Sequence, residues 1–164
     1  MDEQGKAVPG TRVLATTGDA FNRVVADSAY TDAGGKFRLR GLRAGAYNVE
    51  GDYRDGALVS FVPWVPYADS AKDIGTDTLR APGSISGTML HQGSPVPGIA
   101  CYLSGTYHSA VSDSAGRFRM HRIPQRTYLL IYYASSPYHV ALDTPVVVLS
   151  GRHTELPPKN LERD

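Results

Sequence analysis

The sequence predicts an all-β protein built from two small β-sandwich domains in tandem. Short runs rich in Val, Tyr, Ile and Phe alternate with turn signals, and 17 Gly and 11 Pro residues punctuate the chain at short intervals. This spacing is typical of sandwiches made of short strands. Residues 31–47 return in similar form as residues 112–128, and a repeat of that length indicates two copies of one domain. We therefore expect domains at residues 1–81 and 82–164.

The two copies share turn formers and core anchors. Asp, Gly, Phe and Tyr recur in the same order, with Phe37 matching Phe118, and the Val-Pro-Gly triplet at residues 8–10 returns at residues 96–98. The copies are 88 positions apart at the triplet but 81 apart at the Phe pair, so the first copy holds seven extra residues between them. None of the shared residues forms a reactive constellation, which indicates that a scaffold was duplicated.

Each copy contains a predicted strand with one apolar and one charged face. In residues 36–40, Phe37 and Leu39 alternate with three cations, and residues 117–121 repeat this pattern around Phe118. A period of two is the mark of a half-buried strand. The Asp- and Gly-containing stretch just before each strand has the composition of a hairpin turn. We expect both Phe side chains to lie in a core.

A tight connection follows each of these strands, and Leu42 or Ile123 is expected beneath it. The strand after the second connection, residues 128–133, is apolar on both faces, which predicts a more central or more covered position than its counterpart in the first copy. A short helical turn is expected at residues 67–72. The remaining expected strands are residues 57–62, 74–79, 85–90, 138–142 and 146–149.

The first copy lacks a leading strand. The second copy begins with an alternating run at residues 84–90, whereas residues 1–7 at the same place in the first copy show no apolar alternation. A sandwich without this strand exposes unpaired backbone groups, which favours a homodimer through the open sheet edge or the addition of a strand from another chain. We interpret the difference as a boundary cut through a longer array of repeats, with a natural N-terminus as the alternative.

Composition and charge exclude several classes of partner. The net charge of +1 gives no strong field, so we expect neither nucleic acid nor an anionic membrane as a partner. No stretch approaches the roughly 20 apolar residues of a membrane span. The single cysteine, Cys101, rules out a disulfide within the chain and lies in an apolar run, where we expect a buried thiol rather than a reactive one. Residues 1–5 are polar and carry no secretory signal.

The second copy carries the motifs of a known family. Residues 93–98 are Gly-Ser-Pro-Val-Pro-Gly, residues 112–118 are Ser-Asp-Ser-Ala-Gly-Arg-Phe, and Ile123-Pro124 and Tyr128 follow. These residues resemble the carboxypeptidase regulatory-like domains, and the first copy shows most of the same pattern. Members of that family are small transthyretin-like (prealbumin-like), Ig-like Greek-key β-sandwiches. The pattern is also similar in part to the collagen-adhesin B-type domains.

The resemblance implies a non-catalytic structural, spacer or interaction module of a secreted, periplasmic or cell-surface multidomain protein. Domains of this family are appended to peptidases, glycan-degrading enzymes and outer-membrane receptors, where they serve as spacers, folding aids or interaction surfaces. The expected partners are then other domains of the parent protein, and no cofactor is implied.

Catalytic and metal-binding motifs are weak in this sequence. There is no Gly-x-Ser-x-Gly elbow, and the five His residues never recur at short ligand spacing. A hydroxyisourate hydrolase of transthyretin-like fold would end in Tyr-Arg-Gly-Ser, which this chain lacks. An intradiol dioxygenase would need two Tyr and two His around iron. Tyr132, Tyr133, Tyr138 and His139 supply those residue types, but the strand preference of Tyr explains them more simply, and we predict no catalytic residue, metal or cofactor.

A basic face on the alternating strands supports a binding hypothesis. Arg38 and Arg40 lie on it in the first copy and Arg119 in the second. Further basic residues extend it: Lys36, Arg43, Arg117, His121, Arg122 and Arg126. Such a face suits an anionic polysaccharide or an acidic protein partner. The alternative is a solvated face that keeps an exposed sheet from aggregating.

An aromatic segment at residues 61–67 supports a second binding hypothesis, since it contains the only Trp of the chain. Its prolines oppose a central strand and favour an edge or a loop. Phe61, Trp64 and Tyr67 are suited to stack on sugar rings or to dock a protein partner. The alternative is that they pack at the base of the first domain or at the junction between the domains.

Overall fold

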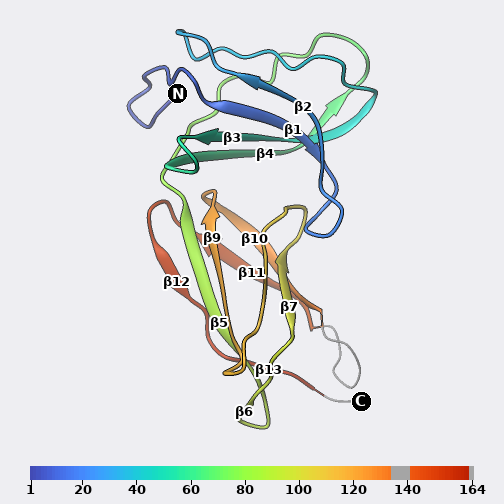
Figure 1. Ribbon diagram of the computed structural model, residues 1–164, viewed down its shortest axis with the longest axis vertical. Helices are drawn as coiled ribbons and strands as arrows, with labels where there is room; N and C mark the ends of the chain where they lie inside the picture. Colours follow the sequence, from blue (N-terminus) through green and yellow to red (C-terminus); the bar gives the residue numbers. More distant parts are fainter. Residues whose placement is uncertain (134–140, 163–164) are drawn as a thin grey trace. The chain divides into compact units, whose positions relative to one another are not determined.

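The computed structural model describes residues 1–133 and 141–162, with side chains described from residue 145 in the second range. Its regular elements are β-strands, with no helix among the described residues, so the all-β class predicted from the sequence is confirmed. The chain divides into two compact units (Figure 1). One consists of Met1–Gly18 and Asn22–Pro82, and the other of Gly83–Asp164 together with Asp19–Phe21.

The first unit is built on a single antiparallel sheet. Its strands are β1 (Arg12–Thr17), β2 (Val24–Tyr30), β3 (Gly45–Tyr53) and β4 (Leu58–Tyr67). They lie in the order β2-β1-β3-β4. Val13, Tyr47 and Val49 are buried on one face of this sheet. Among the described residues of this unit, no second sheet covers that face.

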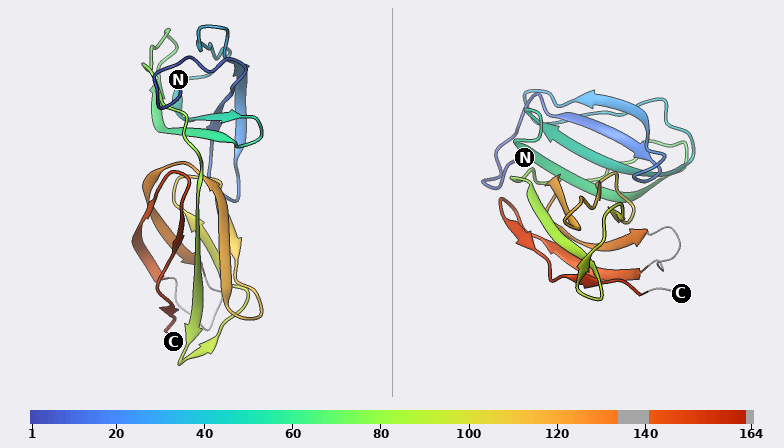
Figure 2. Two further views of the ribbon diagram at one scale, coloured as in Figure 1. Left: turned by 90° about the vertical axis from the view of Figure 1, so that its left-hand side faces the viewer. Right: turned by 60° about the horizontal axis from the view of Figure 1, so that its bottom comes forward.

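The second unit is a sandwich of two sheets. One sheet contains, in spatial order, β11 (Ala141–Val148), β10 (Arg126–Tyr133), β7 (Ala100–Leu103) and β8 (Ser109–Val111). The other is centred on β5 (Gly83–His91), with β6 (Ser94–Pro95), β9 (Arg117–Ile123), β12 (His153–Glu155) and β13 (Lys159–Asn160). β6 and β9 pair with β5 antiparallel, whereas β12 and β13 pair with it in parallel. β5 runs the length of the unit (Figure 2). Ile85 and Met89 on it are fully buried, as are Leu130 and Val148 of the other sheet.

The predicted alternation in the second copy is confirmed by β9. Phe118 and Met120 are each 3% exposed, while Arg119 between them is exposed. β9 lies beside β5, with Phe118 opposite Gly87. A Cβ atom at Gly87 would lie 2.7 Å from the Phe118 ring, so the absence of a side chain there lets the ring rest directly on β5.

The prediction of a corresponding strand in the first copy is wrong. Residues 36–40 form no strand, and Phe37 and Leu39 remain only half-buried. The physical reason is the partner: β9 is held in a ladder by β5, and the first unit has no strand in the place of β5. An alternating sequence without a neighbouring strand has the pattern of a strand but not the hydrogen bonds.

The shared Asp residues build one turn twice. In the first unit, Gly34 and Lys36 donate backbone N–H groups to Asp32 Oδ1 at 2.9 Å. In the second unit, the amides two and four positions after Asp113 donate to its Oδ1 at 2.9 and 2.8 Å. The turns predicted from the repeat are therefore confirmed, because each Asp closes the chain onto its own carboxylate.

The shared Tyr residues fix the tight connection that follows. Tyr47 donates its hydroxyl to the carbonyl of Arg43 at 2.8 Å, and Tyr128 donates to that of Pro124 at 2.9 Å. Both bonds span four residues and pin the start of the next strand. Burial of the Tyr128 ring raises the pKa of its hydroxyl above the usual range, which keeps it a donor at any ordinary pH.

The hydroxyls of Thr31 and Ser112 hold the Val-Pro-Gly turns, and they also locate the seven extra residues. Each donates to the carbonyl of the Val in its triplet, at 2.7 and 2.8 Å. Each also accepts an amide, from Thr11 at a separation of 20 residues and from Ile99 at a separation of 13. The seven additional residues therefore lie within the longer β1–β2 hairpin of the first unit.

The remaining strand predictions are right in part. β5 and β4 contain the runs expected at residues 85–90 and 57–62, apart from residue 57, and β11 contains residues 146–148. Residues 138–140 of another expected strand lie outside the described residues. The helical turn expected at residues 67–72 is wrong, and residues 74–79 form no strand. The strands that were not predicted are β1, β2, β6, β7, β8, β12 and β13.

β10 lies between β11 and β7, so it is an internal strand. β3 has the same internal position in the first unit, between β1 and β4. The outward side chains of β10 are not covered in the described structure, because Leu129 is 43% and Tyr133 57% exposed. Apolar residues on both faces of this strand thus reflect strand preference and not burial on both sides.

The two Phe positions should differ in their effect on stability. We expect Phe118→Ala to lower the free energy of unfolding of its unit by about 3–5 kcal/mol, because it opens a cavity in a closed core. Phe37→Ala should cost less than half as much, since its ring is already half-exposed. Urea unfolding followed by far-UV circular dichroism would measure both, with Val111→Ala (63% exposed) as control. Equal losses of unfolding free energy at the two Phe positions would contradict the finding that no second sheet covers the inner face of the first unit.

Candidate functional site

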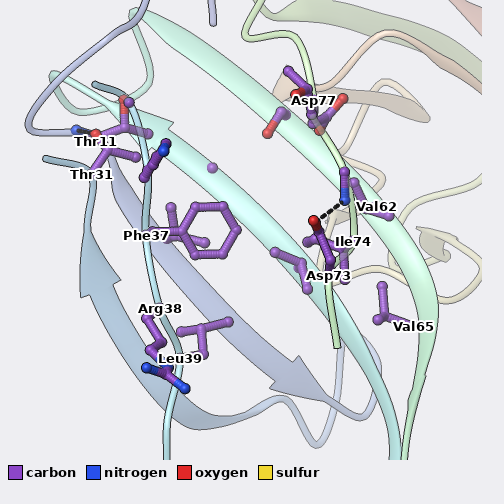
Figure 3. A pocket seen from close by; sticks show the side chains of 18 of the residues that line it. Thr11, Thr31, Phe37, Arg38, Leu39, Val62, Val65, Asp73, Ile74 and Asp77 are labelled. Atoms are coloured by element: carbon purple, nitrogen blue, oxygen red, sulfur yellow. Dashed lines mark hydrogen bonds between the residues drawn. The ribbon is translucent and has the colours of Figure 1, made fainter. Parts of the chain in front are cut away.

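The first unit contains a cavity of about 1080 Å³ over the inner face of its sheet (Figure 3). Val13, Val49 and Val62 contribute to an apolar floor. Residues 36–40 form one wall and residues 71–77 form another. Figure 3 shows Phe37 and Ile74 on opposite sides of this space. The cavity occupies the place that the second sheet of a sandwich would fill.

Apolar side chains on the cavity walls are incompletely covered. Phe37, Leu39 and Leu42 are all half-buried, whereas their counterparts in the second unit are 3% exposed or less: Phe118, Met120 and Ile123. Burial stabilises by about 25 cal/mol for each Å² of apolar surface removed from water. The walls therefore retain a driving force for binding an apolar partner.

The wall at residues 36–40 is anchored at both ends. Lys36 is held by the turn at Asp32, and the backbone N–H of Arg40 donates to Asp27 Oδ2 at 2.5 Å. Between these anchors, Phe37 to Leu39 make no backbone hydrogen bond to another described residue. An extended segment fixed at its ends with unpaired groups between them has the geometry of a strand that awaits a neighbour.

The predicted aromatic residues do not converge on one site. Trp64 is 71% exposed, and it lies on the edge strand β4 rather than in a loop. Its φ of 55° and its N–H bond to Asn48 Oδ1 at 3.3 Å mark a bulge, where the β3–β4 register shifts. Tyr67 lines the cavity, while Phe61 and Trp64 do not. Packing of Trp64 at the base of the first domain is wrong, because its indole is mostly in solvent.

The predicted basic residues are exposed, and they belong to two different units. Arg38 and Arg40 lie beside the cavity on the wall at residues 36–40, whereas Arg119 lies on β9 of the other unit. Each is exposed, as the alternation predicted. Their use in binding stays a prediction.

A cluster of Ser86, His153 and Glu155 was missed by the sequence reasoning. β12 pairs in parallel with β5 and brings His153 beside Ser84 and Glu155 beside Ser86. Ser86 Oγ lies 2.8 Å from His153 Nε2 and donates to Glu155, and Ser84 Oγ lies 2.9 Å from His153 Nδ1. Ser86 lies 67 residues before His153 and 69 before Glu155, so no local spacing in the sequence indicates the cluster.

These hydrogen bonds join side chains of two paired strands. The hydroxyl of Ser86 donates to the Glu155 carboxylate, and both ring nitrogens of His153 lie within hydrogen-bond distance of serine hydroxyls on β5. The cluster therefore fastens β12 to β5 on an exposed face.

The thiol of Cys101 is fully buried, as predicted. Its Sγ lies 3.7 Å from the carbonyl of Ile99. Burial raises the pKa of this thiol to about 12, and desolvation by burial likewise raises the pKa of the neighbouring Tyr132 hydroxyl to about 12. Cys101 is therefore a core side chain at neutral pH, because only the thiolate is strongly nucleophilic.

Within residues 1–133 and 141–162, no three His, Cys, Asp or Glu side chains lie close enough together to hold a metal ion. The described part of the chain also contains no helix with the length and apolar character needed to cross a membrane.

No family model matches this sequence, and no curated protein matches it either. Among solved structures, the chain is similar to the minor pilin GBS52 of Streptococcus agalactiae, with 12% identity and a TM-score of 0.48 over 98% of this chain and 85% of that one. A streptococcal ancillary pilin gives 16% identity and a TM-score of 0.47 over 100% of this chain and 60% of the pilin. A type II cohesin-X-dockerin complex from Acetivibrio cellulolyticus gives 21% identity and a TM-score of 0.37 over 46% of this chain and 52% of that one. This chain thus spans about half the length of that last relative, and similarity at this level assigns no function.

Cys101 should be inert in the folded protein. We expect a thiol reagent such as dithionitrobenzoate to label it at neutral pH only after denaturation, because the thiol is buried and its pKa is raised. The absorbance of the thiolate that the reagent releases would follow the reaction. The urea-unfolded protein would serve as the reference for full labelling. Rapid stoichiometric labelling without denaturant would contradict the buried position.

Glu155 should titrate below an ordinary glutamate. The hydrogen bond from Ser86, and then the one from His153, lowers the pKa of its carboxyl. A carboxyl whose pKa is depressed by folding adds stability above its ordinary pKa, and that contribution is lost as the pH falls through the lower folded value. Carboxyl NMR should show Ser86→Ala moving the midpoint up toward the ordinary range, while Thr88→Ala, two positions further on the same face of β5, leaves it in place. An unchanged midpoint in Ser86→Ala would contradict the assignment.

Proposed function

We propose that the chain is a non-catalytic structural and interaction module of a secreted or cell-surface multidomain protein, made of two carboxypeptidase regulatory-like sandwich domains in tandem. Its first partners are then the other domains of the parent protein. One observation carries the proposal: the polar side chains that the two copies share are engaged by backbone groups of their own unit. A duplicated set of residues used in this way supports a scaffold.

The evidence is the same in each unit. Asp32 and Asp113 close turns, Tyr47 and Tyr128 pin a connection, and a hydroxyl holds each Val-Pro-Gly turn. A catalytic or ligand-binding repeat would instead direct polar groups into a shared cleft. The Ser86 cluster, which has the residue types of a hydrolase, fastens two strands and has no counterpart in the repeat.

A carbohydrate- or protein-binding module is the second candidate, and the exposure of Trp64 favours it. An indole that is 71% exposed on a bulged edge strand offers a flat apolar face that a sugar ring or a protein partner can cover. The basic residues Arg38, Arg40 and Arg119 belong to the same hypothesis, as contacts for an anionic polysaccharide.

A panel of neutral glycans, anionic polysaccharides and other polyanions separates the two candidates. For a scaffold we expect the emission of Trp64 to be that of a solvent-exposed indole and to stay unchanged through the panel. Trp64→Ala and the triple variant Arg38→Ala, Arg40→Ala, Arg119→Ala serve as matched controls. A saturable shift in NMR spectra that either variant abolishes, or a shift in Trp64 emission that the triple arginine variant abolishes, would replace the scaffold with the binding module.

A further inference from the structure

We propose that the outer face of the sheet β11-β10-β7-β8 in the second unit is an interface through which two copies of this chain form a symmetric dimer. The large side chains that define this apolar outer face are Val111, Leu129, Ile131, Tyr133, Val147 and Leu149. The proposal goes beyond the scaffold role and does not rest on it, because a scaffold and a binding module are both compatible with a dimer.

Strand pairing joins these side chains into one surface. The odd-numbered residues of β10 point outward, because the even-numbered ones from 128 to 132 are buried in the core. β11 places Val147 opposite Thr127. β7 and β8 place Ala100 and Val111 in one row with Tyr133. Directly opposite side chains in a sheet lie about 5 Å apart, so the face is continuous across all four strands.

The large side chains of this face are in contact with water. Leu129 and Leu149 are each 43% exposed, Val147 is 53%, Tyr133 57% and Val111 63% exposed. Among the side chains that the structure describes, none of those pointing outward from these four strands is charged. Monomeric proteins rarely expose contiguous apolar patches of more than a few hundred Å², and charged residues are depleted at the centre of protein interfaces.

The outer face of the opposite sheet provides a comparison within the same unit. It carries Arg117 and Arg119 on β9 and His153 and Glu155 on β12, all of them exposed. Strand preference explains the apolar residues of β10 taken alone. It does not explain why one outer face of the sandwich is charged and the other apolar, since both are made of strands. Contact with a partner explains the difference.

A second copy of the same face is the partner that the composition favours. A two-fold symmetric interface brings a surface against itself, so an uncharged apolar face meets an apolar match and no like charge. The other outer sheet faces in the described part of the chain offer no such match. The outer face of the sheet in the first unit carries Arg12, Glu50 and Asp52.

The size of the face agrees with a reversible dimer. β10 and β11 have eight residues each, β7 four and β8 three. A strand residue covers about 16 Å² of a sheet, so the face measures roughly 350–400 Å² in plan. Protruding side chains raise the accessible area further, and each partner of a small stable interface contributes about 600 Å². The face is thus large enough for a reversible dimer and too small for an obligate one.

One part of the sheet is already covered. The ring of Phe21, which belongs to the same compact unit, packs edge-on against Tyr102 with the ring centroids 5.2 Å apart. The area open to a partner is therefore centred on β10 and β11, with Leu129 near its middle.

Sedimentation equilibrium of the whole chain over a wide range of concentration tests the proposal. We expect a reversible monomer–dimer equilibrium with a dissociation constant in the micromolar range. Leu129→Arg should raise that constant by about a hundredfold or more, because the substitution buries an unpaired charge from each copy. Thr88→Arg, on the outer face of β5, is the matched control and should leave the constant unchanged.

Opposite charges at one position test the symmetry of the dimer. A two-fold axis through the middle of the face places Leu129 against its own copy. Leu129→Arg and Leu129→Glu should therefore each be monomeric, and an equimolar mixture of the two should dimerise again. Far-UV circular dichroism checks that each variant is folded, and Val147→Arg on the neighbouring strand replaces them if they are not.

Three outcomes would overturn the proposal. The first is a strictly monomeric chain at every concentration. The second is a dimer that persists in both Leu129→Arg and Val147→Arg, which would assign the interface to another surface. The third is a dimer that Thr88→Arg weakens equally, or a mixture of the Arg and Glu variants that stays monomeric, which would exclude a symmetric contact through this face.

Discussion

The structure depends on one strand, β5, which pairs with a neighbouring strand on each side. In the second unit β5 receives β9 on one side and β12 on the other, and Ile85 and Met89 fill the core between the sheets. β5 thus both hydrogen-bonds to the backbone of its neighbours and contributes apolar side chains to the core. In the first unit that strand is absent. A similar alternation of apolar and basic residues there produces a segment that is anchored at both ends, has no strand partner and lines a cavity.

Local features of the sequence predicted local features of the structure. The Asp turns and the alternation of β9 follow from side chains and neighbours a few residues away, as does the burial of Cys101 in an apolar run. These are short-range effects that a single chain segment determines. The strand expected at residues 36–40 failed for a different reason, because a strand is a property of a pair and its partner is not local.

The candidate site shows the same division. Phe37 and Leu39 were identified as core-facing residues, and they do face the inner side of the unit. They border an open cavity because the rest of the unit supplies no strand to cover them. The alternation of residues 36–40 carries no information on that strand. The Ser86, His153 and Glu155 cluster depends on parallel pairing between strands far apart in the chain, and no sequence signal short of the fold itself indicates it.

The bulge at Trp64 has a consequence for self-association. β4 is an edge strand of the first sheet, and an exposed edge is a template on which sheets extend from molecule to molecule into fibrils. Two prolines remove amide donors from this edge, and the positive φ of Trp64 bends it out of register. These two features hinder the addition of strands from other molecules to the edge of β4.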